Sequence, residues 1–86
     1  MKRYDEILDK IQTEMKMKNI KNKKRNIRLC VLNEIKYLTK KELQSIAKND
    51  SWLFTDSGFT KGNTTEWIKA ILMEDLVAET KVNLST

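Results

Sequence analysis

The chain has no histidine and no proline, and it contains one cysteine and two glycines among its 86 residues. Without histidine, neither a Ser-His-Asp nor a Cys-His catalytic arrangement can form. The single thiol, Cys30, excludes an intrachain disulfide, and a zinc site would have to draw its other ligands from carboxylates. The lack of proline leaves long helices uninterrupted. These absences predict a non-enzymatic protein of a reducing compartment, with no metal and no other cofactor.

Long apolar runs are missing as well. The longest uninterrupted runs, 29–32 and 70–73, have four residues each, whereas a membrane span needs about 20. Acidic side chains stand at Asp5 and Glu6, where a signal peptide needs an apolar stretch. We therefore expect a cytoplasmic protein with no membrane partner. Because Cys30 lies between Leu29 and Val31, we expect its thiol to be buried as a small apolar group.

The net charge of +5 is divided unevenly along the chain. Residues 1–48 carry 14 Lys/Arg against 6 Asp/Glu, a balance of +8, whereas residues 49–86 carry 3 lysines against 6 acids, a balance of −3. A strongly basic segment is typical of surfaces that meet polyanions. The length predicts one domain, 1–86, with a thin core. We expect one face of the protein to meet polyanions and another face to have a different role.

The apolar spacing predicts a mainly α fold of about four helices. Apolar residues recur at three- and four-residue steps over 3–18 and 26–38. Thr39 and Glu42 form a capping box before a helix at 40–49, and Asn63 or Thr64 is the expected cap of a helix at 64–76. Residues 77–84 alternate in part, which predicts a short strand paired with part of 52–55. This minor β element is expected to be a small hairpin or wing.

Residues 27–84 carry a pattern with a known counterpart. Leu38-Thr39, Glu42-Leu43 and Ala47 are followed by Ile71-Leu72 and Leu76-Val77. This order resembles the winged helix-turn-helix superfamily of DNA-binding regulators, in which the first motif marks the first two helices and the second marks the recognition helix that runs into the wing. The resemblance implies a three-helix winged-helix-like core at 26–86. An N-terminal amphipathic helix plus a basic connection, residues 1–25, is added to that core.

The segment 16–28 is the most basic part of the chain, with seven Lys/Arg among thirteen residues and no acid. Such a cluster releases counterions from nucleic-acid phosphates and predicts a short, mobile basic arm that grips duplex DNA. The alternatives are a merely solvated connection and an acidic protein partner. We expect Lys40 and Lys41 to position the helix-turn-helix, with Thr64, Thr65 and Lys69 on the base side. The residues of the arm itself are Lys16, Lys18, Lys21, Lys23, Lys24, Arg25 and Arg28.

Two apolar features leave further alternatives open. Trp52, Leu53, Phe54 and Phe59 either cap a small core or form an interface with a protein partner, since large aromatics dominate interface energetics. The apolar stripe of residues 3–18 either packs on the core or pairs with its copy in a homodimer.

The hypothesis for function follows from the basic arm and the resemblance. We expect a small DNA-binding regulator from a bacterial mobile element such as a phage, plasmid or genomic island, an origin suggested by the abundance of Lys, Asn and Ile. The alternative is an accessory subunit or inhibitor. It would bind a larger replication, repair or defence enzyme through the aromatic and acidic C-terminal half.

Overall fold

The computed structural model describes residues 3–49 and 65–85, and these residues form four α-helices and no strand. The helices are α1 (Arg3–Met17), α2 (Lys24–Ile35), α3 (Lys40–Asn49) and α4 (Thr65–Leu84). The predicted mainly α fold is therefore confirmed. The bounds of α3 are those predicted from the capping box, and α2 begins and ends two or three residues earlier than the apolar spacing indicated.

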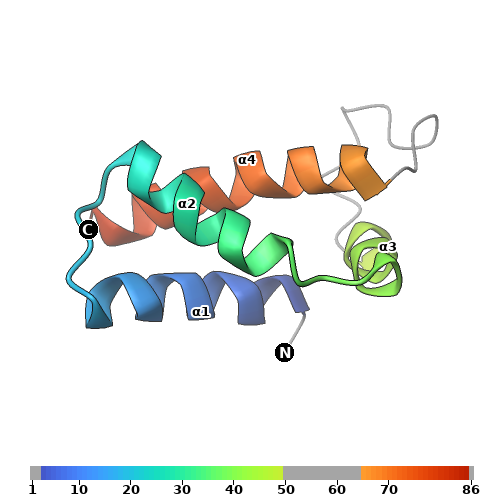
Figure 1. The fold of residues 1–86 in the computed structure, drawn as a ribbon, viewed down its shortest axis with the longest axis horizontal. Helices are drawn as coiled ribbons and strands as arrows, with labels where there is room; N and C mark the ends of the chain where they lie inside the picture. Colours follow the sequence, from blue (N-terminus) through green and yellow to red (C-terminus); the bar gives the residue numbers. More distant parts are fainter. Residues whose placement is uncertain (1–2, 50–64, 86) are drawn as a thin grey trace.

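Three of the helices form a bundle, and the fourth closes one end of it (Figure 1). α1 and α4 run in the same direction, and α2 runs back between them in the opposite direction, with contacts to both. α3 packs against the N-terminal part of α4. The short connection between α1 and α2 explains their antiparallel arrangement. α4 therefore contacts every other helix that the structure describes.

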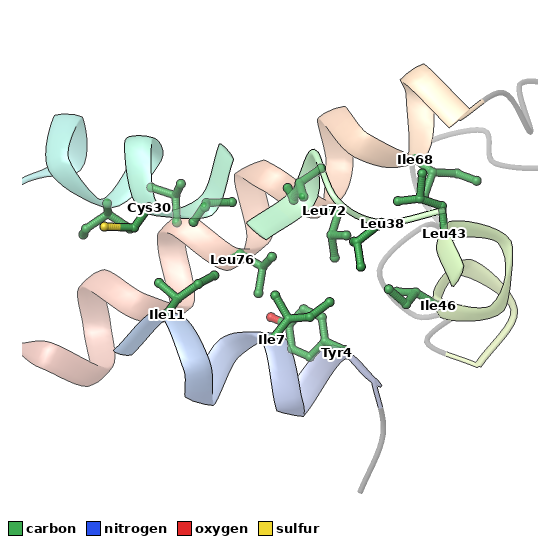
Figure 2. Close-up of a cluster of buried hydrophobic side chains, with 14 of the residues drawn as sticks. Tyr4, Ile7, Ile11, Cys30, Leu38, Leu43, Ile46, Ile68, Leu72 and Leu76 are labelled. Atoms are coloured by element: carbon green, nitrogen blue, oxygen red, sulfur yellow. The ribbon is translucent and has the colours of Figure 1, made fainter. Parts of the chain in front are cut away.

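The core is built around one stripe of α4. Ile68, Leu72, Leu76 and Thr80 recur every four residues, and each is 0% exposed. Apolar side chains from the other three helices surround this stripe, as Figure 2 shows for the residues it labels. Fully burying one such aliphatic side chain stabilises a fold by about 1.5–3 kcal/mol. The other buried apolar residues are Tyr4, Ile7, Ile11, Met15, Ile27, Cys30, Val31, Ile35, Leu38, Leu43, Ile46, Ala47 and Val77.

The strand predicted at 77–84 is wrong, because these residues continue α4. Val82 and Leu84 suggested a two-residue alternation, but Leu84 belongs to the four-residue series that runs through Leu72, Leu76 and Thr80. Thr80 interrupts the apolar pattern of this helical period, because a polar residue occupies a position that faces the core. The described residues thus contain no β element, and the proposed pairing segment 52–55 lies outside them.

The apolar stripe of α1 is used inside the chain. Tyr4, Ile7, Ile11 and Met15 are at most 5% exposed, and α1 contacts both α2 and α4. A homodimer through residues 3–18 stays a prediction, but it would have to use the outward face of α1.

Capping and an ion pair fix the start of α3. The Thr39 backbone N–H donates to Glu42 Oε1 and the Glu42 N–H donates to Thr39 Oγ1, both at 3.1 Å, which confirms the capping box. The Arg3 guanidinium lies 3.0 Å from Glu42 Oε2, so the start of α3 is tied to the start of α1. The Thr39 N–H, and after it the charge of Arg3, hold the pKa of Glu42 below its ordinary value.

Tyr4 links α1 to α4 through a polar contact. Its hydroxyl donates a hydrogen bond to Asp75 Oδ2, while the ring lies in the core (Figure 2). Burial first, and then the Asp75 carboxylate, raises the pKa of Tyr4 well above its ordinary value of 10.0. The folded state therefore keeps the phenol proton at pH values where the unfolded chain loses it.

Tyr4 should make the protein lose stability in alkaline solution. The contribution of the raised pKa is fully present below pH 10 and is lost as the pH rises above 10, by up to about 1.4 kcal/mol per pH unit. Tyr4→Phe removes this contribution. Urea denaturation from pH 8 to pH 11 should therefore show the stability difference between wild type and Tyr4→Phe shrinking above pH 10. The exposed Tyr37 provides the control, because Tyr37→Phe keeps the buried Tyr4 and should retain the loss of stability that Tyr4 causes above pH 10. A constant difference between wild type and Tyr4→Phe would contradict the prediction.

Thr80 should be a site where the fold can be stabilised. Its Oγ1 is buried and has no hydrogen-bond partner in the part of the chain that the structure describes. Leaving a buried hydroxyl unpaired costs about 1–3 kcal/mol. Thr80→Val keeps the shape of the side chain, so it should raise the free energy of unfolding by about 1 kcal/mol in urea denaturation. Thr13→Val, on the exposed side of α1, is the matched control and should change stability little; a destabilised Thr80→Val variant would show that the hydroxyl is needed.

Candidate nucleic-acid interface

The candidate site lies where α1 ends and α2 begins, beside the C-terminal end of α4 (Figure 1). Seven predicted cations gather there on the last turn of α1, the connection 18–23 and the first turns of α2, and all seven are exposed. We call this surface the basic end. It consists of Lys16, Lys18, Lys21, Lys23, Lys24, Arg25 and Arg28.

A C-capping motif shapes the start of the connection. Asn19 has a positive φ of 54°, a conformation that asparagine tolerates better than most residues. The Ile20 N–H donates to the Met15 carbonyl at 2.9 Å and the Asn19 N–H to the Lys16 carbonyl at 3.2 Å, the pattern of a Schellman motif. Ile20 packs against the core beyond it. The chain therefore leaves α1 along a defined path, and Lys16 and Lys18 both belong to the segment that forms this turn.

Asparagine side chains attach the connection to the rest of the protein. Asn22 Nδ2 donates to the Lys81 carbonyl at 3.2 Å and to Ser85 Oγ at 3.0 Å, and Lys81 Nζ donates back to the Asn22 carbonyl at 3.1 Å. Asn26 Nδ2 donates to the Lys21 carbonyl at 3.1 Å. The basic arm predicted as a mobile connection is thus anchored to the end of α4. Its lysines extend from a backbone that these hydrogen bonds fix in place.

Positive charges repel one another at the start of α2. Lys23 is the N-cap and makes no side-chain capping hydrogen bond, and the first turn contains no acidic residue. The N-terminus of a helix carries a partial positive charge, so cations at Lys23, Lys24 and Arg25 repel it. Unpaired N–H groups and nearby cations are together well suited to a phosphate. An anion bound here would relieve the repulsion.

Among the residues that the structure describes, a carboxylate pairs with one cation of the basic end. Lys18 Nζ lies 2.9 Å from Glu14 Oε1, and this hydrogen bond raises the pKa of Lys18. The other six cations form no ion pair with a carboxylate of the described residues. By contrast, Lys10 pairs with Glu34 at 3.3 Å on the side of the bundle formed by α1 and α2. The basic end therefore presents positive charge that the described carboxylates leave uncompensated.

The structure separates the remaining predicted contacts from the basic end. Lys40 and Lys41 are exposed on the first turn of α3, which lies at the opposite end of the molecule (Figure 1). α4 spans the distance between these ends, about 30 Å for its 20 residues. Thr65 begins α4 at that far end, and Lys69 lies beside Lys36 near the end of α2. Thr64 and the predicted interface residues Trp52, Leu53, Phe54 and Phe59 lie outside the described residues.

One cation of the site, Lys81, was not predicted from the sequence. Lys81 lines a hollow together with Lys24 and Arg28, although 53 positions or more separate it from them in the chain. Because a strand was predicted at 77–84, the sequence did not indicate that Lys81 lies near Lys24 and Arg28. The four-residue spacing of Leu72, Leu76, Thr80 and Leu84 was the pattern that indicated a longer helix, and a longer helix carries Lys81 to the basic end.

Other chemistry is limited in the part of the chain that is described. Cys30 is buried as predicted, and burial raises the pKa of its thiol. Within residues 3–49 and 65–85, no three cysteine or acidic side chains are placed to hold a metal ion. Over the same ranges, every helix is too short or too polar to cross a membrane.

Comparisons with known proteins add no further constraint. No protein-family model, no curated protein and no solved structure matches the chain. The fold and the charges of the basic end therefore carry the functional argument.

Proposed function

We propose that this protein is a small DNA-binding protein that holds the phosphates of duplex DNA with the basic end. The observation that carries the proposal is the group of six exposed cations on an anchored backbone with no carboxylate partner among the described residues. Each phosphate neutralised by a cation releases condensed counterions, which supplies affinity at low salt. An anchored backbone loses less conformational entropy on binding than a mobile arm does.

In this proposal α2, and not α4, is the helix that faces the DNA. The first turn of α2 offers Lys24, Arg25 and unpaired N–H groups, and phosphates at a helix N-terminus gain from both. α4 exposes Glu66, Glu74 and Glu79, which a phosphate backbone repels. Helices that enter the major groove normally present their N-terminal residues to the base edges. In this proposal Arg28, one turn into α2, is a further cation that faces the DNA.

The proposed biological role is that of a regulator encoded by a bacterial mobile element. The pattern in residues 27–84 that resembles winged helix-turn-helix regulators supports it, as does the composition rich in Lys, Asn and Ile. In this proposal the protein acts in the cytoplasm without a cofactor, and the phosphate contacts set its register on the duplex.

Charge reversal at the basic end should weaken DNA binding strongly. The triple variant Lys23→Glu/Lys24→Glu/Arg25→Glu removes three phosphate contacts, so it should weaken binding to a fluorescent random duplex at least tenfold. The slope of log affinity against log salt should fall by about 3, because each phosphate contact contributes about 0.9 to it. Fluorescence anisotropy over a series of salt concentrations measures both quantities.

The control carries the same charge change at the other end of the molecule. Lys40→Glu/Lys41→Glu/Lys48→Glu alters three exposed lysines of α3 and should keep the affinity within about twofold. Equal losses in both triple variants would show that only net charge matters, and retained affinity in the first variant would refute the basic end as the site.

Single-stranded DNA should bind less tightly than the duplex, since the basic end has no aromatic side chain on which bases stack.

A further inference from the structure

A groove with apolar walls lies between α2 and α4. Leu29 is 56% exposed and Leu32 is 46% exposed on the outward side of α2, although both are large aliphatic residues. Leu32 lines a hollow together with Ala70 and Met73 of α4, and Leu29 lines the adjacent hollow on α2. Ala70, Met73 and Ala78 of α4 line a third hollow together with Lys24 and Arg28 of α2. Three hollows with common lining residues join along this surface, and one of them has a volume of about 510 Å³. We call this surface the α2–α4 groove.

Cations surround the apolar part of the groove. Lys24, Arg25, Arg28 and Lys81 lie at the end near the C-terminus of α4, and Lys36 and Lys69 lie at the other end. Glu66 and Glu74 are the acidic residues among the described lining, so the groove has a balance of +4. An occupant must therefore cover apolar side chains and bring negative charge to both ends.

These two requirements select among occupants. A second copy of the chain, related by a twofold axis, would bring one basic groove against another, and like charges across an interface disfavour it. A nucleic-acid backbone would satisfy the cations but would leave Leu29 and Leu32 in water. An amphipathic helix with acidic flanks satisfies both requirements, because its apolar stripe meets the leucines and its carboxylates meet the lysines.

We propose that the α2–α4 groove docks an acidic amphipathic α-helix of a partner protein. The lining residues of α4 run from Glu66 to Lys81, about 22 Å along the axis, which is the length of a four-turn helix. Ala70 and Ala78 are small, so the backbone of the partner can approach α4 closely. Lys24 and Arg28 belong both to the groove and to the basic end, and a docked acidic helix therefore excludes DNA from that end.

The test is a selection from displayed helical peptides about 16 residues long. One face of each peptide carries apolar residues, and the other positions are drawn at random from Glu, Asp, Lys, Arg, Gln and Ser. Selection against the full chain should enrich acidic residues over basic ones beside the apolar stripe. Enrichment of basic or uncharged peptides, or no enrichment above selection without the protein, would overturn the proposal.

Two double variants locate the bound peptide. Leu29→Ser/Leu32→Ser should weaken binding of a selected acidic peptide at least tenfold and should leave the affinity for duplex DNA unchanged. Met17→Ser/Val82→Ser replaces two apolar residues that are 81% and 62% exposed outside the groove, and it should leave peptide binding unchanged. Circular dichroism confirms that both variants remain helical.

Each remaining outcome has a clear meaning. Undiminished peptide binding by Leu29→Ser/Leu32→Ser would refute the groove as the docking site. Self-association in sedimentation experiments that this variant abolishes would assign the groove to a second copy of the chain. Loss of DNA binding by the same variant would assign the groove to nucleic acid, since neither substitution changes a charge. The docking proposal and the DNA-binding proposal therefore succeed or fail separately.

Discussion

Burial of one face of α4 is the interaction on which the rest of the structure depends. Ile68, Leu72, Leu76 and Thr80 line the contact with the other three helices, and each is fully removed from water. A chain of 86 residues buries a smaller fraction of its surface than a larger protein, so few apolar contacts can be lost before the fold fails. The length of α4 also sets the distance between the basic end and α3, because these features lie at its two ends.

The same packing sorts the charges of the protein onto different sides. The Asp75 carboxylate of α4 accepts the hydrogen bond from Tyr4, and Glu14 and Glu34 pair with Lys18 and Lys10. Each of these carboxylates pairs with a residue of α1 or of the turn that follows α1, where it balances local charge or holds helices together. The start of α2 and the α2–α4 groove receive few of the acids and keep their positive charge. The same helix bundle thereby has two different basic surfaces. One surface is suited to phosphates, and the other surface is suited to an acidic, partly apolar ligand.

Local interactions made the bounds of α1 and α3 predictable to within one residue, whereas long-range packing made other features unpredictable. The capping box of Thr39 and Glu42 joins residues three positions apart, so the sequence alone located α3. Asn19 favours the end of a helix through its own backbone conformation, and α1 ends just before it. The final turns of α4 were missed because Thr80 is buried by its neighbours from other helices, and no local rule assigns a threonine to a core position.

By itself, the sequence determined that the chain is mainly helical, that it lacks histidine-based catalysis, and that seven cations follow one another closely at 16–28. Helical period and composition act over a few residues, which is why these properties can be derived without a structure. Only the tertiary structure decided which charges share a surface: it joined Lys81 to Lys24 and Arg28, and it moved Lys40 and Lys41 to the opposite end. The reason is that the burial of α4, and not the order of residues, sets the neighbours of an exposed side chain.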